Sequence, residues 1–195
     1  MIYKNFFKPV IDYTLALIGI LIVSPILIIT AVLIKLESPG PIIFTQERLG
    51  LNYRIFKVYK FRSMTNKKRE FDKQVFVGDS EITKLGNYLR RLKIDELPQL
   101  FNILKGDMSL VGPRPSLPNL KEKLNEDGMF RVKVKPGVTN LAAVNGSIYL
   151  TWPERWVFDR YYVENLSLKL DLEIIFKTII VVFMGENYFN KKNGI

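Results

Sequence analysis

The sequence predicts an α+β protein that is mostly helical, with a membrane-seated helix at its N-terminus and a small domain behind it. Three observations lead to this class. A predominantly apolar run covers residues 10–34, apolar residues recur at helical spacing in three later segments, and only two short segments are candidate strands. The 195 residues suffice for one anchor and one compact core. We therefore expect an anchor over residues 1–37 and a domain over residues 38–195.

Two features of the apolar run bear on how its helix sits in the membrane. Pro25 lacks the N–H that a helix needs at that position, so a bend is expected, and the Ser24 hydroxyl can bond the carbonyl that Pro25 leaves free. Lys4 and Lys8 precede the run and Lys35 ends it, which favours placing both ends on the cytoplasmic side. A helix that enters and leaves through the same face satisfies both features.

A straight, membrane-spanning helix is the competing interpretation, because a rod of about 37 Å is long enough to cross a bilayer. The residues alone leave these two interpretations open. A cleaved signal peptide is disfavoured, since the run ends in Glu37-Ser38-Pro39-Gly40-Pro41, a helix stop rather than a cleavage site. Asp12, near the start of the run, is expected at the membrane–water interface.

The domain is expected to contain short strands followed by helices. Residues 41–44 and 53–64 are predicted strands, and residues 65–73 are polar and predicted to form a loop. Helices are predicted over residues 83–93 and from an N-cap at Asp95 to Leu104. The second of these should bury one apolar face, formed by Leu97, Leu100, Phe101 and Leu104. Residues 166–184 are too polar to span a membrane, but suit a helix that packs on the domain or lies in the interface.

Composition restricts the chemistry that this chain can perform. It contains no cysteine and no histidine, which removes thiolate chemistry, the usual general base near neutral pH and the commonest zinc ligand. Acid–base or nucleophilic work must therefore fall to Asp, Glu, Lys, Tyr, Ser or Thr. The net charge of +10 indicates an anionic partner: a phosphate compound, a negative membrane surface or a nucleic acid.

Asp95 and Glu96 are the leading catalytic candidates. They form a pair of carboxylates at a predicted helix start, directly after the basic residues Arg90, Arg91 and Lys93. A cap and a favourable first-turn acid would explain them without any function. The alternative is chemical: helix dipole and arginines should depress the pKa of Asp95, and an ionised carboxylate can bind Mg²⁺ or attack phosphorus.

Four cations are candidates for binding phosphate, because guanidinium forks and ammonium groups match phosphate oxygens. They are Lys60, Arg62, Arg90 and Arg114. Taken one at a time, each is more readily explained as a solvated surface charge. No Walker loop, dinucleotide-binding glycine motif or nucleophile elbow occurs in the sequence. The residues alone thus indicate a membrane-associated protein with an anion site and a candidate carboxylate nucleophile.

The chain resembles the bacterial sugar transferase family, the small monotopic phosphoglycosyl transferases. The resemblance runs over most of the chain and rests on several long motifs in the same order. They are Ser24-Pro25, Ser38-Pro39-Gly40-Pro41, Phe44-Thr45-Gln46-Glu47-Arg48-Leu49-Gly50, Lys60-Phe61-Arg62-Ser63-Met64, Ile94-Asp95-Glu96-Leu97-Pro98-Gln99-Leu100, Lys105-Gly106-Asp107-Met108-Ser109-Leu110-Val111-Gly112-Pro113-Arg114-Pro115, Pro136-Gly137-Val138-Thr139, Asp159-Arg160-Tyr161-Tyr162 and Leu170-Asp171-Leu172.

The resemblance implies a re-entrant membrane helix bent at Ser24-Pro25 and a catalytic domain on the cytoplasmic face of the bacterial inner membrane. It implies that Asp95 attacks the β-phosphate of a UDP-sugar, releasing UMP, and that polyprenyl (undecaprenyl) phosphate then takes the phosphosugar from Asp95. Glu96 would assist, Mg²⁺ would bridge Asp95 and the diphosphate, and Arg90 would hold a phosphate. A homodimer is among the oligomeric states left open.

One departure from the family pattern concerns specificity. The family commonly has Gly after the Thr of the Pro-Gly-x-Thr motif and Gln further on, where this chain has Asn140 and Ala143. This puts the sugar or nucleotide preference in doubt. Two other classes of protein compete with an enzyme. A non-catalytic protein that binds anionic lipid would not need Asp95-Glu96 with Arg90, and a nucleic-acid-binding domain would not need the apolar run.

Overall fold

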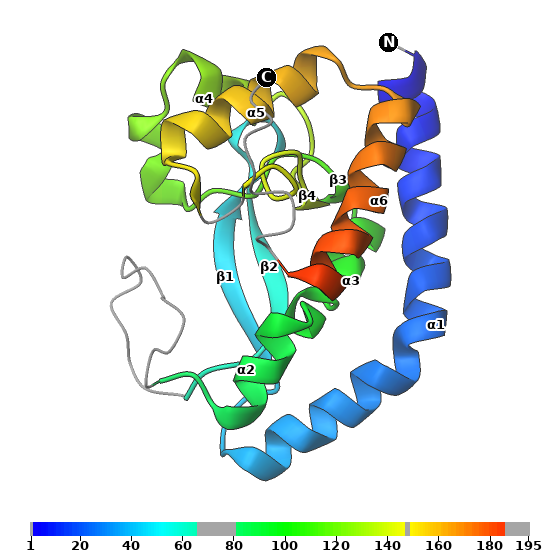
Figure 1. Cartoon of the computed structure of the whole chain (residues 1–195), viewed down its shortest axis with the longest axis vertical. Helices are drawn as coiled ribbons and strands as arrows, with labels where there is room; N and C mark the ends of the chain where they lie inside the picture. Colours follow the sequence, from blue (N-terminus) through cyan, green and yellow to red (C-terminus); the bar gives the residue numbers. More distant parts are fainter. Residues whose placement is uncertain (1, 66–80, 147–148, 186–195) are drawn as a thin grey trace.

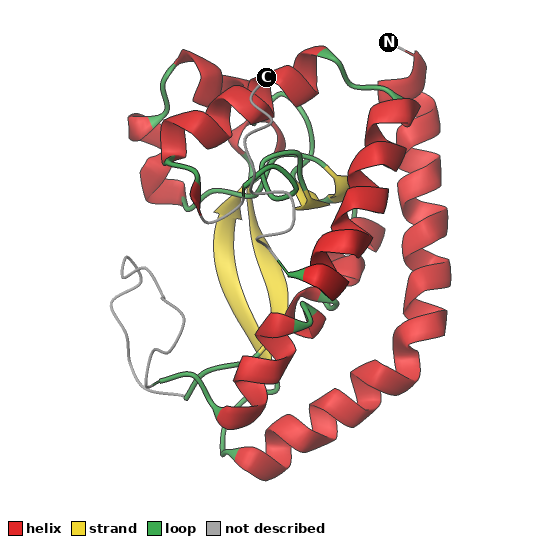
Figure 2. Ribbon diagram, in the orientation of Figure 1, coloured by secondary structure: helices red, strands yellow, loops and turns green. Residues whose placement is uncertain are grey.

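The computed structural model describes residues 2–65, 81–146 and 149–185 (Figure 1). The predicted loop over residues 65–73 lies outside them, apart from its first residue. Helices surround two small sheets (Figure 2), so the predicted α+β class with mostly helical content is confirmed. The α-helices are α1 (Lys8–Glu37), α2 (Lys84–Arg91), α3 (Gln99–Leu104), α4 (Glu126–Phe130), α5 (Trp152–Glu164) and α6 (Leu168–Met184). The strands are β1 (Ile43–Leu49), β2 (Ile55–Phe61), β3 (Ser109–Val111) and β4 (Gly137–Thr139).

Short segments of other helix types flank or connect these elements. A π-helical turn, η1 (Tyr3–Phe7), leads into α1, and named 3₁₀ segments come later in the described part of the chain. These are η2 (Leu51–Tyr53), η3 (Ile94–Glu96) and η4 (Pro118–Lys123).

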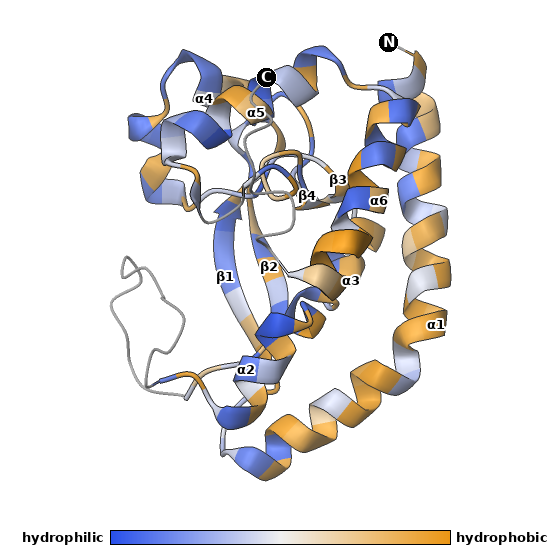
Figure 3. Cartoon of the chain, in the orientation of Figure 1, coloured by the Kyte–Doolittle hydropathy of each residue, from blue (hydrophilic) through white to orange (hydrophobic). Residues whose placement is uncertain are grey.

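The long helix α1 consists of two arms that meet at a bend (Figure 1). Pro25 lies inside it, and its missing N–H is the one that would reach the carbonyl of Leu21 in a regular helix. The Ser24 hydroxyl donates to that carbonyl instead, at 2.9 Å. By its length and composition, the helical segment from Tyr3 to Glu37 is long enough and apolar enough to cross a membrane. Figure 3 shows hydrophobic residues along most of both arms.

The first arm of α1 is fixed to the domain by buried charges. The Lys8 ammonium donates to Asp171 of α6 at 2.7 Å, and both residues are buried. The hydroxyls of Tyr3 and Tyr162 also donate to Asp171, at 2.6 and 2.7 Å. The carboxylate of Asp12 accepts from Ser109 of β3. Asp12 was expected at the membrane–water interface; it is 7% exposed and lies against the protein instead, because β3 supplies it with hydrogen-bond donors.

The second arm of α1 ends against the same domain. Ser38 is the C-terminal capping residue, and the Arg62 guanidinium donates to its carbonyl at 2.7 Å and to the Pro39 carbonyl at 2.8 Å. These carbonyls come directly after the last helical turn, where partners inside the helix run out, so a buried cation suits them. Both ends of the apolar helix are therefore bound to one domain.

The domain is built around a long antiparallel ribbon of β1 and β2, paired from Ile43 with Phe61 to Leu49 with Ile55. Both predicted strands are confirmed, although β1 runs further along the chain than expected. A second sheet pairs the short strands β3 and β4 in parallel. One hydrophobic core lies under this second sheet, where the buried residues come from β3, α5 and α6 and from residues 134–144.

The helix after Asp95 differs from the prediction. Asp95 does not cap it: the residue lies in η3, and α3 begins at Gln99 without a side-chain cap. The predicted apolar face is buried only in part. Leu100 and Leu104 pack against a core cluster, but Phe101 is 44% exposed and Asn102 is fully buried. Asn102 accepts from the Tyr59 N–H at 3.0 Å and donates to the Lys57 carbonyl at 2.8 Å, so α3 turns a polar residue towards β2.

Candidate active site

A close contact between α2 and the end of β2 brings the site residues together. Thr83 caps α2 by accepting from the Gly86 N–H at 2.9 Å. A Cβ on Gly86 would lie 2.0 Å from the carbonyl oxygen of Ser63, so only glycine permits this approach. As a result, Arg90 in the last turn of α2 reaches the Ser63 hydroxyl, with a donor–acceptor distance of 2.9 Å.

The turn after α2 carries the two carboxylates. Lys93 adopts a left-handed conformation (φ 57°), which ends the helix and redirects the chain into η3. Asp95 and Glu96 stand in this 3₁₀ turn, against β2 on one side and the loop of residues 112–115 on the other. Local sequence signals for an N-cap are present, but the αL turn at Lys93 overrides them.

Glu96 is clamped between two cations. Its Oε1 accepts a hydrogen bond from the Lys60 ammonium on β2, and the Arg114 guanidinium lies 3.2 Å from the same oxygen. Burial alone would raise the pKa of Glu96, but the charges of Lys60 and Arg114 outweigh burial and hold this pKa well below its usual range. Glu96 is therefore a fixed anion. Burial lowers the pKa of Lys60, although the negative charge of Glu96 acts to raise it.

Asp95 is placed quite differently, although it is the neighbouring residue. Its side chain is buried, with the residue 8% exposed, yet within residues 2–65, 81–146 and 149–185 its carboxylate accepts no hydrogen bond and forms no ion pair. Buried carboxylates are normally paired, so one without a protein partner is a candidate for binding a ligand. Burial and then the charge of Glu96 raise the pKa of Asp95, against the charges of Lys60 and Arg90, which lower it.

This pKa corrects the expectation from sequence. Helix dipole and nearby arginines were expected to depress the pKa of Asp95. In the structure no regular helix begins at this residue, and desolvation together with the adjacent Glu96 exceeds the effect of the cations. The two carboxylates thus have pKa values displaced in opposite directions, an arrangement that separates their chemical roles.

Of the four predicted phosphate-binding residues, three are brought to the carboxylates and one is not. Lys60 and Arg114 contact Glu96, and the charge of Arg90 acts on Asp95. Arg62 instead is buried against the end of α1, where its guanidinium also donates to Ser38 Oγ at 3.0 Å. Strand alternation would give Arg62 the same face as Lys60, but β2 ends at Phe61, and the capping carbonyls of α1 draw the guanidinium away.

Two further arginines belong to these surroundings and were missed from sequence. Arg48 of β1 is largely buried, and burial together with the charges of Arg114 and Arg131 lowers its pKa to about 10. The Arg131 guanidinium donates to the backbone carbonyl of Arg114 at 2.6 Å and lies 3.3 Å from Asp159 of α5. Arg48 stands inside one of the motifs that carry the family resemblance, which was the one available signal. The position of Arg131 depends on tertiary contacts.

The site offers limited ligands for a metal. Among the residues that the structure describes, no cluster of three or more Asp, Glu, His or Cys side chains is found. Within that part of the chain, Asp95 has both carboxylate oxygens free of protein partners, whereas one oxygen of Glu96 is engaged. Mg²⁺ in proteins is often held by one or two carboxylates with the substrate's phosphates. The donor set fits that kind of site, with Asp95 as the protein ligand.

The unusual environment of Asp95 leads to a direct prediction. Its pKa, measured by carboxyl ¹³C NMR or difference infrared titration, should lie above that of an exposed aspartate. Glu96→Gln removes the neighbouring negative charge and should lower the pKa of Asp95. Glu122→Gln on the exposed turn η4 should leave it unchanged. An Asp95 that titrates like an exposed aspartate, or does not respond to Glu96→Gln, would contradict the described environment.

Comparison with known proteins supports the family resemblance that the sequence motifs indicate. The family model described as bacterial sugar transferase matches residues 3–185. A UDP-N-acetylgalactosamine-undecaprenyl-phosphate N-acetylgalactosaminephosphotransferase of Aeromonas hydrophila is 42% identical over 92% of this chain and 44% of its own length. An undecaprenyl-phosphate glucose phosphotransferase of Komagataeibacter xylinus is 41% identical over 93% of this chain and 37% of its own.

The chain thus spans less than half the length of these two relatives. A relative of similar size is the uncharacterized sugar transferase EpsL of Bacillus subtilis, which is 39% identical over 95% of this chain and 90% of its own length. Both the family model and this relative cover nearly the whole chain. The protein therefore belongs to the bacterial sugar transferase family.

Proposed function

We propose that this protein is a phosphoglycosyl transferase that moves a sugar phosphate from a UDP-sugar to polyprenyl phosphate through a covalent intermediate on Asp95. The observation that carries the proposal is the contrast between the two carboxylates. Asp95 is buried and lacks a protein partner among the described residues, while Glu96 is held by Lys60 and Arg114. A free carboxylate surrounded by cations suits attack on a phosphate, because the cations offset the repulsion between two anions.

Both steps of the transfer conserve atoms and electrons. A carboxylate oxygen of Asp95 attacks the β-phosphorus of the UDP-sugar, and the bond from that phosphorus to the bridging oxygen breaks, so that UMP leaves with the electron pair. A phosphate oxygen of the lipid then attacks the same phosphorus. The bond to Asp95 breaks, its electron pair returns to the carboxylate, and the polyprenyl diphosphate sugar is formed. No general base is required for either attack, which is consistent with a chain that lacks histidine.

The cations have separate tasks in this scheme. Arg90 and Arg114 approach from α2 and from the loop of residues 112–115, so they are positioned to bind phosphate oxygens from two sides. Lys60 and Glu96 form a fixed pair that keeps a charged environment in place before substrate arrives. Mg²⁺ bound at Asp95 would neutralise charge on the diphosphate. The raised pKa of Asp95 is then compatible with ionisation once cations approach.

The names of relatives support the substrate classes but not one sugar. The Aeromonas protein is named for N-acetylgalactosamine, the Komagataeibacter protein for glucose, and both for undecaprenyl phosphate. Where this chain departs from the family pattern, Asn140 is buried and accepts from the Ala143 N–H at 2.8 Å. The altered residues therefore close a turn on themselves. We propose this turn, directly after β4, as a place where specificity differs from that of relatives.

The attachment of α1 supports a re-entrant rather than a spanning helix. Lys8 and Asp12 in the first arm and Ser38 after the second arm all bind the same domain. A helix that crossed the bilayer would leave its first residues on the opposite side from that domain, and these buried contacts would be lost. The bend at Ser24-Pro25 lets both ends return to one face. With the basic flanks, this supports the cytoplasmic face of the inner membrane.

Exposed apolar residues support partial burial of the domain in the leaflet. They lie on helices that contact α1: Tyr88 and Leu92 from α2 and its C-cap, Phe101 from α3, and Phe176, Ile179 and Phe183 from α6. Large apolar side chains exposed on helices beside a membrane helix suit a membrane interface. Such a position would bring Asp95 near the phosphate of a membrane lipid.

The central test compares Asp95→Asn with Glu122→Gln in UMP release from a panel of UDP-sugars with undecaprenyl phosphate. Asp95→Asn keeps the size of the side chain but removes the nucleophile, and should lower turnover by at least about 10³-fold. Glu122→Gln, an exposed change, should retain turnover. Near-native UMP release by Asp95→Asn would rule out the proposed intermediate.

Topology can be tested because the chain contains no cysteine. Cysteines are introduced singly at Asn5, on the exposed side of the first turn, and at Glu122 in the domain. A membrane-impermeant thiol reagent should label neither in intact cells, and both after permeabilisation. Labelling of the residue 5 cysteine from outside, with the residue 122 cysteine protected, would indicate a spanning helix instead.

A further inference from the structure

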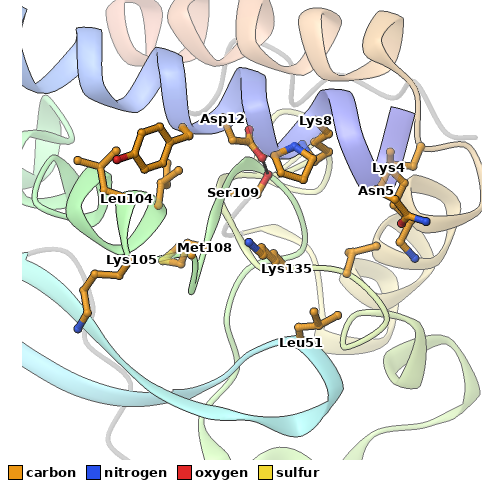
Figure 4. Close-up of a pocket in the computed structure, with 16 residues that line it drawn as sticks. Lys4, Asn5, Lys8, Asp12, Leu51, Leu104, Lys105, Met108, Ser109 and Lys135 are labelled. Atoms are coloured by element: carbon orange, nitrogen blue, oxygen red, sulfur yellow. Dashed lines mark hydrogen bonds and ion pairs between the residues drawn. The ribbon is translucent and has the colours of Figure 1, made fainter. Parts of the chain in front are cut away.

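The contact between α1 and β3 lies close to the loop that reaches Glu96. The Asp12 carboxylate accepts from the Ser109 hydroxyl at 2.6 Å and from the Leu110 N–H at 3.2 Å. Figure 4 shows Asp12 of α1 and Ser109 facing each other on the wall of a pocket of about 430 Å³. Ser109 is 1% exposed, so this is a buried link between the membrane helix and a strand of the domain.

The strand continues directly into a stiff loop. Gly112 donates its N–H to the Thr139 carbonyl at 3.0 Å, and the Pro113 carbonyl accepts from the Gly137 N–H at 3.0 Å. A Cβ on Gly112 would lie 2.4 Å from the Lys135 carbonyl oxygen, so the backbones touch here. Prolines on both sides of Arg114 remove further freedom. A shift of β3 is therefore passed on to Arg114 rather than absorbed by the loop.

Arg114 depends on its backbone for position. Its side chain is 52% exposed and extends to Glu96 at 3.2 Å, while Arg131 holds its carbonyl. A half-exposed guanidinium is confined little by packing, so the place of its fork depends on its polar contacts, among them Glu96, and on where its Cα is held. The α1 contact at Ser109 and the Arg131 contact at residue 114 hold the two ends of this segment.

We propose that Asp12 is a positioning residue for the active site: the membrane helix, through Ser109 and Leu110, sets the place of Arg114 beside Glu96. This role rests on the proposed function. It makes the first arm of α1 a structural part of the catalytic site in addition to an anchor. Loss of the hydrogen bonds between α1 and β3 then lowers activity while the domain remains folded.

The test is a double-mutant cycle in the full chain reconstituted in lipid nanodiscs. Asp12→Asn and Ser109→Ala each break the link and should lower kcat/KM for the UDP-sugar on the order of 10-fold, since small misplacements of a positioning group are costly. Arg114→Lys already removes the guanidinium fork. In that background, each of the two substitutions should lower kcat/KM by a further factor of less than about 2. Lys4→Gln, which removes a bond from the same arm to the Lys133 carbonyl, should change neither background.

A second readout does not depend on activity. Amide hydrogen exchange of residues 109–114 should become faster in Asp12→Asn and Ser109→Ala, and stay unchanged in Lys4→Gln. Equal losses of activity in both backgrounds, or unchanged exchange, would overturn the positioning role and leave Asp12 as a stabilising residue. If the unaltered protein itself releases no UMP, the proposed function fails, and the exchange data still decide whether Asp12 holds this loop.

Discussion

The buried charges that bind the first arm of α1 to the domain determine most of the architecture. Asp171 accepts hydrogen bonds from the Lys8 ammonium and from two tyrosine hydroxyls, and Asp12 accepts hydrogen bonds from β3. Buried charges are costly unless they are paired, so these groups are stable only when α1 and α6 lie side by side. This constraint fixes where the apolar helix begins, requires its bend to return the chain to the same domain, and acts close to the loop that reaches Glu96.

Within the site, two adjacent residues of the same chemical kind have opposite properties. Glu96 stays ionised, and its ion pairs with Lys60 and Arg114 compensate its charge and fix its side chain. This makes Glu96 unsuited to form a covalent bond. Asp95 is desolvated, lies beside a like charge and has no protein partner in the described part of the chain. Such a carboxylate gains more from binding a metal or a phosphorus atom than a paired one would, because it gives up no contact with a protein group in doing so. The asymmetry arises from tertiary contacts to β2 and the loop of residues 112–115.

Local signals in the sequence were sufficient for several elements. The apolar run and Pro25 predicted a bent membrane helix, alternation predicted β2, and Thr83 with the apolar spacing after it predicted α2. The apolar residues after Pro41 predicted only the start of β1. The long motifs identified the family and its carboxylate pair. These features depend on neighbours close along the chain, or on patterns that recur among related proteins.

The failures share one physical cause, which is contact between residues distant in sequence. The αL turn at Lys93 displaced Asp95 from the helix start, and burial reversed the expected direction of its pKa shift. Asn102 faces the interior because β2 presents unpaired backbone groups to it. Asp12 and Arg62 were assigned to the membrane interface and to substrate, but pair with Ser109 and with the end of α1. None of these partners can be read from spacing alone.

The proposed mechanism requires a covalent bond at Asp95. The most direct measurement mixes the protein with a UDP-sugar and no lipid acceptor, quenches in acid and maps the peptides by mass spectrometry. We expect a mass increase of one sugar phosphate on the peptide that contains Asp95, together with up to one equivalent of UMP, and neither for Asp95→Asn. An unmodified peptide, with UMP released only after polyprenyl phosphate is added, would contradict this mechanism and indicate direct transfer between the two substrates.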